Sequence, residues 1–491
     1  MKLYERIMEL ALTRSFFFPS NEIYGAQSGF YDYGPTGKLI KNRLESLWRE
    51  MFIQEEGFFE VETAIINPEI VFKASGHVDE FTDPVVECQK CHKKTRADHL
   101  VEERLNVKWD GKLQSLEKLI FDNNIPCPSC GGQLSKPFLS NLMFSTQIGV
   151  DGEKGYLRPE TAQGIFTSFL RIFRNHGTKL PLAVAQIGKS FRNEISPRKA
   201  LVRLREFTQM ELEYFFDPDE PRIEGFEKIK NKKIRFLTRD AQGRKQNAEW
   251  LTAKEIVENG YTNEIMAYFL VKEWNYYAAV GLNPERMWFR HLLENETPHY
   301  SKSNVDLEVE TSYGIIEISG NAYRTNYDLS QHEKFSKQKM EVAVNNKKVV
   351  PHVFEVSMGV DRLFFCLLEH TFREKSEEKD WEWFDFKPAV APYDVAVFPL
   401  MKRDGLAEKA EEVAKELRKK LIVHYQESGS IGKRYARADE IGIPYAITID
   451  YQTLEDETAT IRFRNSGRQE RVGIKMLFEK IEQYKKEGKV D

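Results

Sequence analysis

Two consecutive strand patterns between residues 179 and 216 constrain the fold more than any other feature of the sequence. The first, from Leu180 to Ile187, is a continuous apolar run, as expected for a strand buried on both faces. The second alternates in character from residue to residue. One of its faces carries Thr208, Met210, Leu212, Tyr214 and Phe216, and the other carries Arg205, Phe207, Gln209, Glu211 and Glu213. The apolar face predicts a core, so the charged face of this returning strand must be wet or catalytic.

The connection between these strands contains Phe191-Arg192-Asn193-Glu194 and then the basic residues Arg198, Lys199, Arg203 and Arg205. Two residues apart on a strand, Arg192 and Glu194 are predicted to point to the same side. A guanidinium can bind a phosphate through two hydrogen bonds, and a carboxylate can accept a hydrogen bond from an adenine amino group. For this segment alone, a surface ladder of salt bridges is the alternative.

A second arginine motif, Met358-Gly359-Val360-Asp361-Arg362, follows a strand pattern at 353–357 and leads into a helical pattern at 362–370. A helix N-terminus favours polyphosphate, so an arginine at this turn suits a nucleotide. The match is short and weak by itself. Because it follows the first motif in order and at the scale of a domain, the two motifs together predict a nucleotide site.

Four of the five cysteines form two pairs, Cys88 with Cys91 and Cys127 with Cys130, separated by 35 residues. This spacing can place four thiolates tetrahedrally around Zn²⁺. Without a secretory signal, two disulfides are disfavoured. His92 and His99 are competing ligands, but the paired cysteines are the simpler set. Because the protein supplies all four ligands, the site is predicted to be structural. Cys366 lies on an apolar helix face and is predicted to be in the core.

The remaining patterns predict an α+β catalytic part, residues 1–388. A helix at 37–56 is followed by an extended segment that contains Pro68, and a core role and a dimer-forming role fit this pair equally well. Polar composition marks insertions at about 72–150, with the cysteines, and at 217–305, with a helix at 264–280.

The acidic stretch 376–388 is predicted to be a linker, after which strands and a helix alternate as in an α/β domain. This domain, residues 389–491, carries nineteen Lys and Arg against eighteen Asp and Glu, which supports contact with a nucleic acid weakly.

A chain of 491 residues is expected to contain two to four structural units. The N-terminal segment lacks the apolar core and the cleavage site of a signal peptide, and no stretch reaches the roughly 18 apolar residues of a membrane span. We therefore expect a cytoplasmic protein with no membrane contact. A net charge of −4 neither requires nor excludes a nucleic acid, which needs only a local basic surface.

Together, the two arginine motifs resemble motifs 2 and 3 of class II aminoacyl-tRNA synthetases, and the helix with Pro68 resembles motif 1. Longer segments narrow the resemblance to the dimeric glycyl-tRNA synthetases and extend it over nearly the whole chain. These segments are YGAQSGFYDYGPTG, FKASGHVDEFTDP, RADHL, LRPETAQGIF, FRNEISPR, REFTQMELEYF and HLLENETPHYSKSNVDLE. The resemblance implies a class II antiparallel sheet flanked by helices, an inserted zinc-ribbon-like module and a C-terminal α/β anticodon-binding domain.

The same resemblance implies an ATP site. Arg192 would hold the α-phosphate and the amino-acid carboxylate, Glu194 the adenine edge and Arg362 the distal phosphate. Phe207 would stack on the adenine, and Glu317 would help to coordinate Mg²⁺. The full ATP set is Arg192, Asn193, Glu194, Val202, Arg203, Leu204, Phe207, Glu317, Ile318, Gly359 and Arg362. Of these, Arg192, Glu317 and Arg362 are expected to be catalytic.

Glycine has no side chain to recognise, so its pocket must read an ammonium and a carboxylate and leave no room for a β-carbon. The resemblance implies a glycine set of Arg96, Glu160, Phe207, Gln209, Glu211, Arg324, Glu355 and Ser357. The residues around Arg324 depart from the family pattern. Because glycine has no smaller competitor and larger amino acids clash, no editing domain is expected. The implied partners are tRNA(Gly), glycine, ATP and a second copy of the chain, with Mg²⁺ and structural Zn²⁺.

Three alternatives remain at the level of the sequence. A binding protein of related fold without aminoacylation would be expected to lack Arg192, Glu194 or Arg362. A ligase that forms an adenylate for an acceptor other than tRNA would usually lack the C-terminal domain. An enzyme of this class that is specific for serine or alanine is the third.

Overall fold

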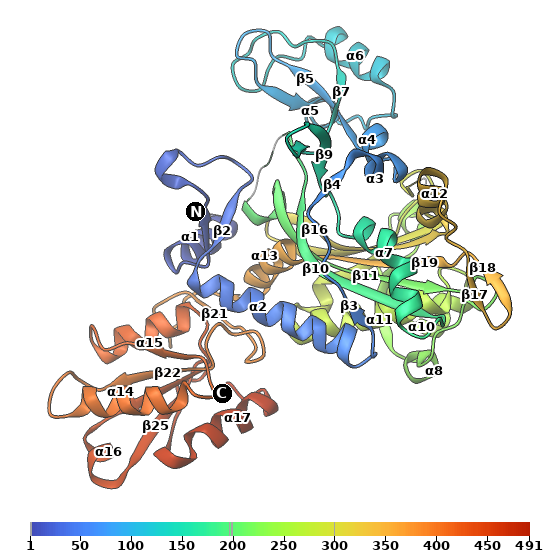
Figure 1. Ribbon diagram of the computed structural model, residues 1–491. Helices are drawn as coiled ribbons and strands as arrows, with labels where there is room; N and C mark the ends of the chain where they lie inside the picture. Colours follow the sequence, from blue (N-terminus) through green and yellow to red (C-terminus); the bar gives the residue numbers. More distant parts are fainter. Residues whose placement is uncertain (1, 196, 198–199, 299) are drawn as a thin grey trace.

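The computed structural model describes residues 2–195, 197, 200–298 and 300–491, and it is built around one large sheet (Figure 1). Nine strands follow one another in the order β13-β12-β14-β15-β16-β19-β11-β10-β3. Neighbours pair antiparallel except at β12–β14 and β10–β3. In chain order the strands are β3 (Phe59–Glu60), β10 (Leu182–Phe191), β11 (Glu206–Phe216), β12 (Lys233–Leu237), β13 (Glu249–Thr252), β14 (Met287–His291), β15 (Ser303–Thr311), β16 (Gly314–Thr325) and β19 (His352–Gly359). The predicted α+β class is confirmed.

The predicted strand pair is present as β10 and β11, which run antiparallel from Leu182 opposite Phe215 to Phe191 opposite Glu206. One face of β11 enters the main core, as predicted. The other face is not wet, because Glu211 and Glu213 are buried as well. The prediction for Arg192 and Glu194 was wrong in one respect: β10 ends at Phe191, so both residues lie in the connection after the strand. The predicted basic residues Arg198 and Lys199 lie outside the described residues.

Helices cover the two faces of the sheet unequally. On one face lie α2 (Pro35–Arg49), α11 (Glu264–Val280) and α13 (Val360–Thr371), which share the largest hydrophobic core with β11, β16 and β19. On the other face α7 (Ala162–Asn175) and α12 (Tyr327–Ser336) pack over one end only, against Leu182 and Phe215. The middle of this second face is therefore left for a site.

The predicted helix at 37–56 is α2, which continues as five π-helical residues, Glu50–Gln54. Ile40, Leu44 and Trp48 are fully buried in the main core, so the core role predicted for this helix is confirmed. After β3, the short strand β4 (Ile66–Pro68) ends at Pro68, as expected for a residue that cannot donate to a strand ladder.

Residues 217–305 do not form a separate module. Their strands β12, β13 and β14 extend the main sheet, and α11 packs beneath it at the predicted position. The next strand, β15, lies inside the sheet between β14 and β16 and was not predicted. Smaller elements of the catalytic part are α1 (Leu3–Thr13), β1 (Phe17–Pro19), β2 (Tyr31–Tyr33), α8 (Phe226–Ile229), α9 (Arg239–Gly243), α10 (Ala253–Glu258), β17 (Val342–Val344) and β18 (Lys347–Val349).

The cysteine-bearing segment forms a small unit that projects from the sheet, at the top of Figure 1. It contains β5 (Thr82–Glu87), β6 (Lys94–Arg96), α5 (Ala97–Leu105), α6 (Leu113–Asp122) and β7 (Phe138–Asn141), around its own hydrophobic core. We call residues 81–142 the cysteine module. At its base lie α3 (Glu69–Ala74), α4 (His77–Glu80), β8 (Ser145–Ile148) and β9 (Glu153–Leu157).

The C-terminal part forms a five-stranded sheet in the order β23-β22-β24-β25-β26. Its strands are β22 (Val395–Pro399), β23 (Val423–Tyr425), β24 (Tyr445–Ile449), β25 (Thr458–Phe463) and β26 (Gln469–Gly473), with helices α14 (Leu406–Leu417), α15 (Ile431–Glu440), α16 (Tyr451–Asp456) and α17 (Leu477–Glu487). Strand β22 pairs parallel with β23 and β24, and helices connect these strands, so the predicted βαβ alternation is present.

The predicted linker is firmly packed. Its short strand β21 (Trp383–Phe384) pairs with β20 (Phe372–Arg373), and Phe384 and Phe386 are fully buried. Nζ of Lys379 lies 3.0 Å from the Asp439 carboxylate in the C-terminal part. Among the helices that the structure describes, none has the length and apolar character to cross a bilayer.

Candidate active site

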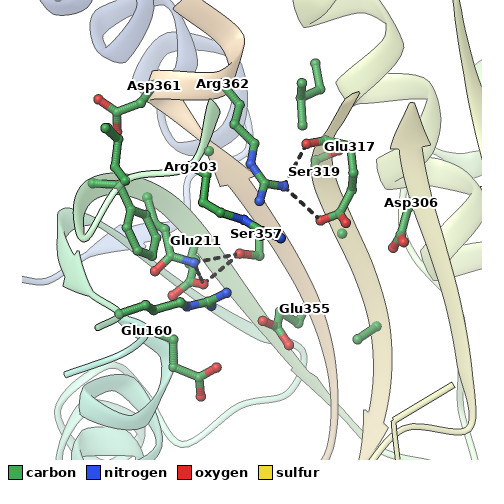
Figure 2. A pocket seen from close by; sticks show the side chains of 18 of the residues that line it. Glu160, Arg203, Glu211, Asp306, Glu317, Ser319, Glu355, Ser357, Asp361 and Arg362 are labelled. Carbon is green, nitrogen blue, oxygen red and sulfur yellow. Dashed lines mark hydrogen bonds and ion pairs between the residues drawn. The ribbon is translucent and has the colours of Figure 1, made fainter. Parts of the chain in front are cut away.

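A cavity of about 350 Å³ occupies the uncovered middle of the sheet, over β11, β16 and β19. Most of the predicted substrate residues meet there. Those that line it are Glu160, Arg192, Glu194, Val202, Arg203, Leu204, Phe207, Gln209, Glu211, Glu317, Ile318, Glu355, Ser357, Gly359 and Arg362. Three predicted residues are not among them, namely Arg96, Asn193 and Arg324. Figure 2 shows Arg203 and Arg362 above Glu160, Glu211 and Glu355, with Glu317 and Asp306 on the other side of Arg362.

At the cationic end, Arg192 and Arg362 come from different parts of the sheet. The Nε of Arg192 donates to the Pro159 carbonyl at 3.1 Å, and its guanidinium lies between the rings of Phe81 and Phe207, at 5.4 and 5.3 Å from their centroids. One terminal nitrogen of Arg362 donates to the Glu317 carbonyl at 2.8 Å. Both guanidiniums are therefore oriented by backbone carbonyls, and that of Arg362 also lies 3.4 Å from the Glu317 carboxylate.

Asp361, next to Arg362, ties the two arginine motifs together. One carboxylate oxygen accepts a hydrogen bond from the Tyr33 hydroxyl at 2.7 Å, and the other accepts from the Thr208 backbone N–H at 2.6 Å. Asp361 thus fixes the start of α13 against β11, and the turn that carries Arg362 is held beside the strand that carries Phe207.

At the anionic end, three glutamates gather around Ser357. The Ser357 hydroxyl donates to Glu211 at 2.7 Å, and the Thr161 backbone N–H donates to the other oxygen of Glu211 at 2.7 Å. Glu355 lies on β19, which pairs with β11, and Glu160 follows the end of β9. All three carboxylates are less than a tenth exposed, so the region is strongly anionic and ready for a cation.

The environment separates the pKa values of these carboxyls. Burial opposes the ionisation of Glu160, but His77 and Arg324 outweigh burial and lower its pKa. Burial and the charge of Glu160 raise the pKa of Glu211. Burial, against the attraction of Arg324, raises the pKa of Glu355 to about 7. Near neutral pH the cluster therefore combines a firmly ionised carboxylate with others that an incoming cation would ionise.

Arg324, which the resemblance places near glycine, does not line the cavity. Its side chain is 2% exposed, with Nε donating to Asp328 at 2.7 Å and a terminal nitrogen donating to Glu355 at 2.5 Å. The carboxylates already engage this guanidinium. Arg324 compensates their charge and orients Glu355 from below.

Arg96 lies on the cysteine module, where it donates to Asp83 at 2.8 Å and pairs with Asp98 at 2.5 Å. It lines a second cavity of about 270 Å³, which shares Arg203, Glu317 and Arg362 with the first. Asn193 is exposed, and its backbone N–H donates to Leu142 at 2.6 Å.

The prediction missed several residues of the cavity, among them Asn304 and Asp306 on β15. Burial and the charge of Glu317 raise the pKa of Asp306 to about 8. A signal was present: Val305, Leu307 and Val309 alternate with polar residues, as in a strand with one apolar face. These positions fell at the edge of the supposed insertion, which hid the pattern.

The four paired cysteines converge as their spacing predicted, with all their sulfurs within 4.8 Å of one another. The Sγ atoms of Cys88 and Cys130 are 3.5 Å apart, and those of Cys91 and Cys127 are 3.8 Å apart. A tetrahedral site with Zn–S bonds of about 2.3 Å requires sulfurs about 3.8 Å apart, so the set fits Zn²⁺. The Cys91 backbone N–H donates to Cys88 and helps to lower the pKa of that thiol to about 6. His92 and His99 lie outside the cluster.

Comparisons with known proteins agree with this geometry. Residues 145–371 match the family model described as the tRNA synthetase class II core domain (G, H, P, S and T), and residues 394–484 match the anticodon binding domain. In three dimensions the chain resembles the prolyl-tRNA synthetase of Cryptosporidium parvum, with a TM-score of 0.60 over 98% of this chain and 77% of that one. At 13% identity, this likeness concerns the fold alone.

Similarity in sequence is more specific. The glycine–tRNA ligase of Methanocaldococcus jannaschii is 39% identical over 99% of this chain and 99% of its own length. That of Pyrococcus furiosus is 40% identical over 98% of both chains. With matches that span nearly all of each chain, and with both domain models in order, the protein belongs to the glycine–tRNA ligase family of class II aminoacyl-tRNA synthetases.

Proposed function

We propose that the protein activates glycine with ATP to give glycyl-adenylate and then transfers glycine to the 3′ end of tRNA(Gly). The observation that carries this proposal is that Arg192 and Arg362 line the same cavity as the buried carboxylates Glu160, Glu211 and Glu355. The arginines suit phosphates, and the carboxylates suit an ammonium. Family membership supplies the reaction that joins these two ligands.

In the ATP site, Arg192 would hold the α-phosphate and the glycine carboxylate, and Arg362 the distal phosphate. Phe207 would stack on the adenine, and Glu194 would accept a hydrogen bond from its amino group. Glu194 lies 3.7 Å from Nε of Arg203, which would orient it. The same cavity is lined by Val202, Leu204, Ile318 and Gly359, which would enclose the nucleotide.

Activation needs no protein nucleophile. The glycine carboxylate attacks the α-phosphorus in line, a new P–O bond forms, and the bond to pyrophosphate breaks. The residues contribute by holding the two reactants together and by neutralising phosphate charge, which are the main sources of catalysis in such transfers. Arg192 is suited to both tasks because the Pro159 carbonyl and two aromatic rings fix its position.

Two metal ions belong to the proposal. Glu317, together with Asp306, would hold Mg²⁺, which would neutralise charge on the phosphates. Both carboxylates line the cavity, and the proximity of Glu317 helps to raise the pKa of Asp306, as expected for an acidic pair without its cation. Cys88, Cys91, Cys127 and Cys130 would hold a structural Zn²⁺ that stabilises the cysteine module.

Selectivity for glycine would come from the lack of space for a larger side chain in the pocket. The ammonium would be held by Glu160, Glu211 and Glu355, with Gln209 and Ser357 supporting Glu211. Glu211 and Glu355 are less than a tenth exposed, and a β-carbon would have to displace these packed polar groups. A serine or alanine substrate is therefore disfavoured without an editing site.

The C-terminal domain, residues 389–491, would contact the anticodon arm, which the match to an anticodon binding domain supports. The catalytic domain would comprise residues 1–388. We further propose a homodimer, in which the exposed apolar side chains of Ile65, Ile66 and Ile70 at β4 would be covered. A cytoplasmic location would suit both translation and the free thiols of all five cysteines.

The deciding experiment is ATP–pyrophosphate exchange measured with each of the twenty amino acids. We expect exchange with glycine and little with alanine or serine. Exchange with serine in place of glycine would refute the specificity. A complete lack of exchange, in a preparation that still binds tRNA, would favour a binding protein over an enzyme.

A further inference from the structure

The segment between α3 and the cysteine module touches both halves of the active site without lining the cavity. This segment, residues 75–81, contains α4 and lies at the base of the module (Figure 1). From its start, His77 reaches the anionic end, and from its end, Phe81 reaches the cationic end. Neither residue is among those that line the cavity.

We propose that His77 and Phe81 are positioning residues for glycine activation, His77 orienting Glu160 and Phe81 holding Arg192. The proposal rests on the function proposed above, because it assigns Glu160 to the glycine ammonium and Arg192 to the phosphate. It also gives the base of the cysteine module a part in catalysis that a purely structural module would not have.

The contacts of His77 support the first assignment. Its Nε2 lies 3.7 Å from one oxygen of Glu160, and the Gln163 side-chain amide donates to the other oxygen at 2.8 Å. Nδ1 of His77 lies 2.8 Å from the Ser75 hydroxyl. When that hydroxyl donates, the proton of a neutral imidazole resides on Nε2 and points toward Glu160. The Glu160 carboxylate then has His77 beside one oxygen and Gln163 and Arg324 beside the other, and the residue lines the cavity.

Phe81 forms one wall of a slot for Arg192. The Arg192 guanidinium carbon lies 5.4 Å from the centroid of Phe81 and 5.3 Å from that of Phe207. A cation between two aromatic faces loses rotational freedom and is attracted by both rings. Because the Pro159 carbonyl binds only Nε, Phe81 restricts the remaining rotation of the guanidinium toward the phosphate position.

The module itself holds this segment in place. The Asn141 side-chain amide, at the end of β7, donates to the backbone carbonyls of His77 at 3.1 Å and Val78 at 2.8 Å. The Leu142 backbone N–H donates to the carbonyl of Phe81 at 3.0 Å. The end of the strand that leaves the module is thus bonded to the segment that carries the two positioning residues.

The test measures the KM for glycine and the KM for ATP separately in ATP–pyrophosphate exchange. For His77→Leu we expect the KM for glycine to rise about tenfold with little change in the KM for ATP, because Glu160 loses the polar imidazole that lies 3.7 Å from its carboxylate. His77→Gln keeps an N–H donor and should recover most of this loss. For Phe81→Leu we expect the KM for ATP to rise or kcat to fall about fivefold, with little change in the KM for glycine. Phe81→Tyr, which keeps a ring, should stay close to the wild type.

Matched controls are His176→Gln, directly after α7, and Phe121→Leu on α6, two exposed side chains that do not line the cavity. Both should leave the two KM values unchanged. KM does not depend on the fraction of folded enzyme, so a modest loss of stability does not obscure the result. For His77→Leu, equal changes in both KM values or no change in either would overturn the proposal. For Phe81→Leu, an unchanged KM for ATP together with an unchanged kcat would overturn it. A wild-type protein without glycine exchange would instead refute the proposed function.

Discussion

Arg192 combines several constraints at the scale of a single residue. It follows β10 and donates to a backbone carbonyl, and its guanidinium lies between two rings. Its backbone N–H donates to the Arg205 carbonyl at 2.9 Å, which closes the connection between β10 and β11. Because the side chain contributes little to the hydrophobic core, its removal should affect catalysis far more than folding.

We predict that Arg192→Ala lowers the rate of glycine-dependent ATP–pyrophosphate exchange by at least a factor of about 100, since a fixed charge at the reacting phosphate is worth roughly 3 kcal/mol or more. The circular dichroism spectrum and the thermal midpoint should stay close to those of the wild type. Arg174→Ala, at an exposed position of α7, is the control and should exchange normally. Retained exchange in Arg192→Ala would refute the role of this arginine.

Glu355 predicts a pH dependence of glycine binding. Burial, with the charges of Glu160 and Glu211, raises its pKa to about 7 against the attraction of Arg324. Below pH 7 the carboxyl gains a proton and loses its attraction for an ammonium, so the KM for glycine should rise as the pH falls from 8 to 6. The increase should approach a factor of about ten per pH unit at most, the limit for one proton.

This prediction is checked by measuring the KM for glycine at pH 6, 7 and 8, with the KM for ATP as an internal comparison. Glu355→Gln should bind glycine more weakly at pH 8 and should show a flatter pH profile. A KM for glycine that stays constant between pH 6 and 8 in the wild type would contradict the assignment of Glu355 to the ammonium.

At the scale of elements, α11 carries a buried carboxyl against β16. Glu273 is fully buried, and the Ser319 hydroxyl, which lines the cavity, donates to it at 2.5 Å. Burial raises the pKa of Glu273 to about 8, although the Ser319 hydrogen bond acts in the opposite direction. The helix therefore holds an acid that is largely protonated near neutral pH.

A raised carboxyl pKa has a definite consequence for stability. The contribution of Glu273 is fully present below its ordinary pKa of 4.5 and is lost as the pH rises through about 8. Glu273→Gln cannot ionise. We therefore predict that the stability of this variant relative to the wild type increases by about 2 kcal/mol between pH 5 and pH 8. Titration of one proton limits such a change to about 1.4 kcal/mol per pH unit.

Thermal midpoints of both proteins at pH 5 and pH 8 test this prediction. Glu258→Gln, at an exposed position of α10, is the matched control and should track the wild type at both pH values. A stability difference between Glu273→Gln and the wild type that is the same at both pH values would mean that Glu273 does not titrate in this range.

The helices and strands also show which parts of the fold the sequence patterns predict. The β10–β11 pair, α2, α11 and the strand-to-helix turn at Gly359 follow from local periodicity and turn residues, and all are present. Strand β15 was missed because its alternation lies in a segment whose charged composition indicated an insertion. The end of β10 at Phe191 also escaped prediction, since the Arg192 to Glu194 connection is shaped by bonds to Leu142 and Arg205 far away in the sequence.

At the scale of the whole molecule, three units are joined by packed connections. The largest core includes Phe384, Phe386 and Phe398, so it continues from the catalytic part into the C-terminal part. Asp394 at the start of the C-terminal domain accepts a hydrogen bond from Arg43 of α2 at 2.9 Å and lies 2.9 Å from Nζ of Lys485. The cysteine module differs, because it has its own hydrophobic core.

We predict that the purified protein contains one zinc ion per chain and that Cys127→Ser lowers this content, since each tetrahedral ligand is needed for tight binding. Metal analysis of the wild type and the variant is the direct measurement. Chelation should make the cysteine module, residues 81–142, the first site of limited proteolysis. Cys366→Ala, which alters a thiol in the main core, should retain its zinc. A metal-free protein with a protease-resistant module would contradict the zinc assignment.

Local order along the chain determined the two arginine motifs, the cysteine pairs and the alternating carboxylate face of β11. The periodicity of apolar residues and the spacing of motif residues carry this information, because residues that are close in sequence lie close together on the same helix or strand. Only the tertiary structure decided that Arg96 faces a second cavity, that Arg324 lies beneath the glutamates, and that Asp306 joins the site. These placements depend on sheet register and on contacts between segments far apart in sequence, which no local pattern encodes.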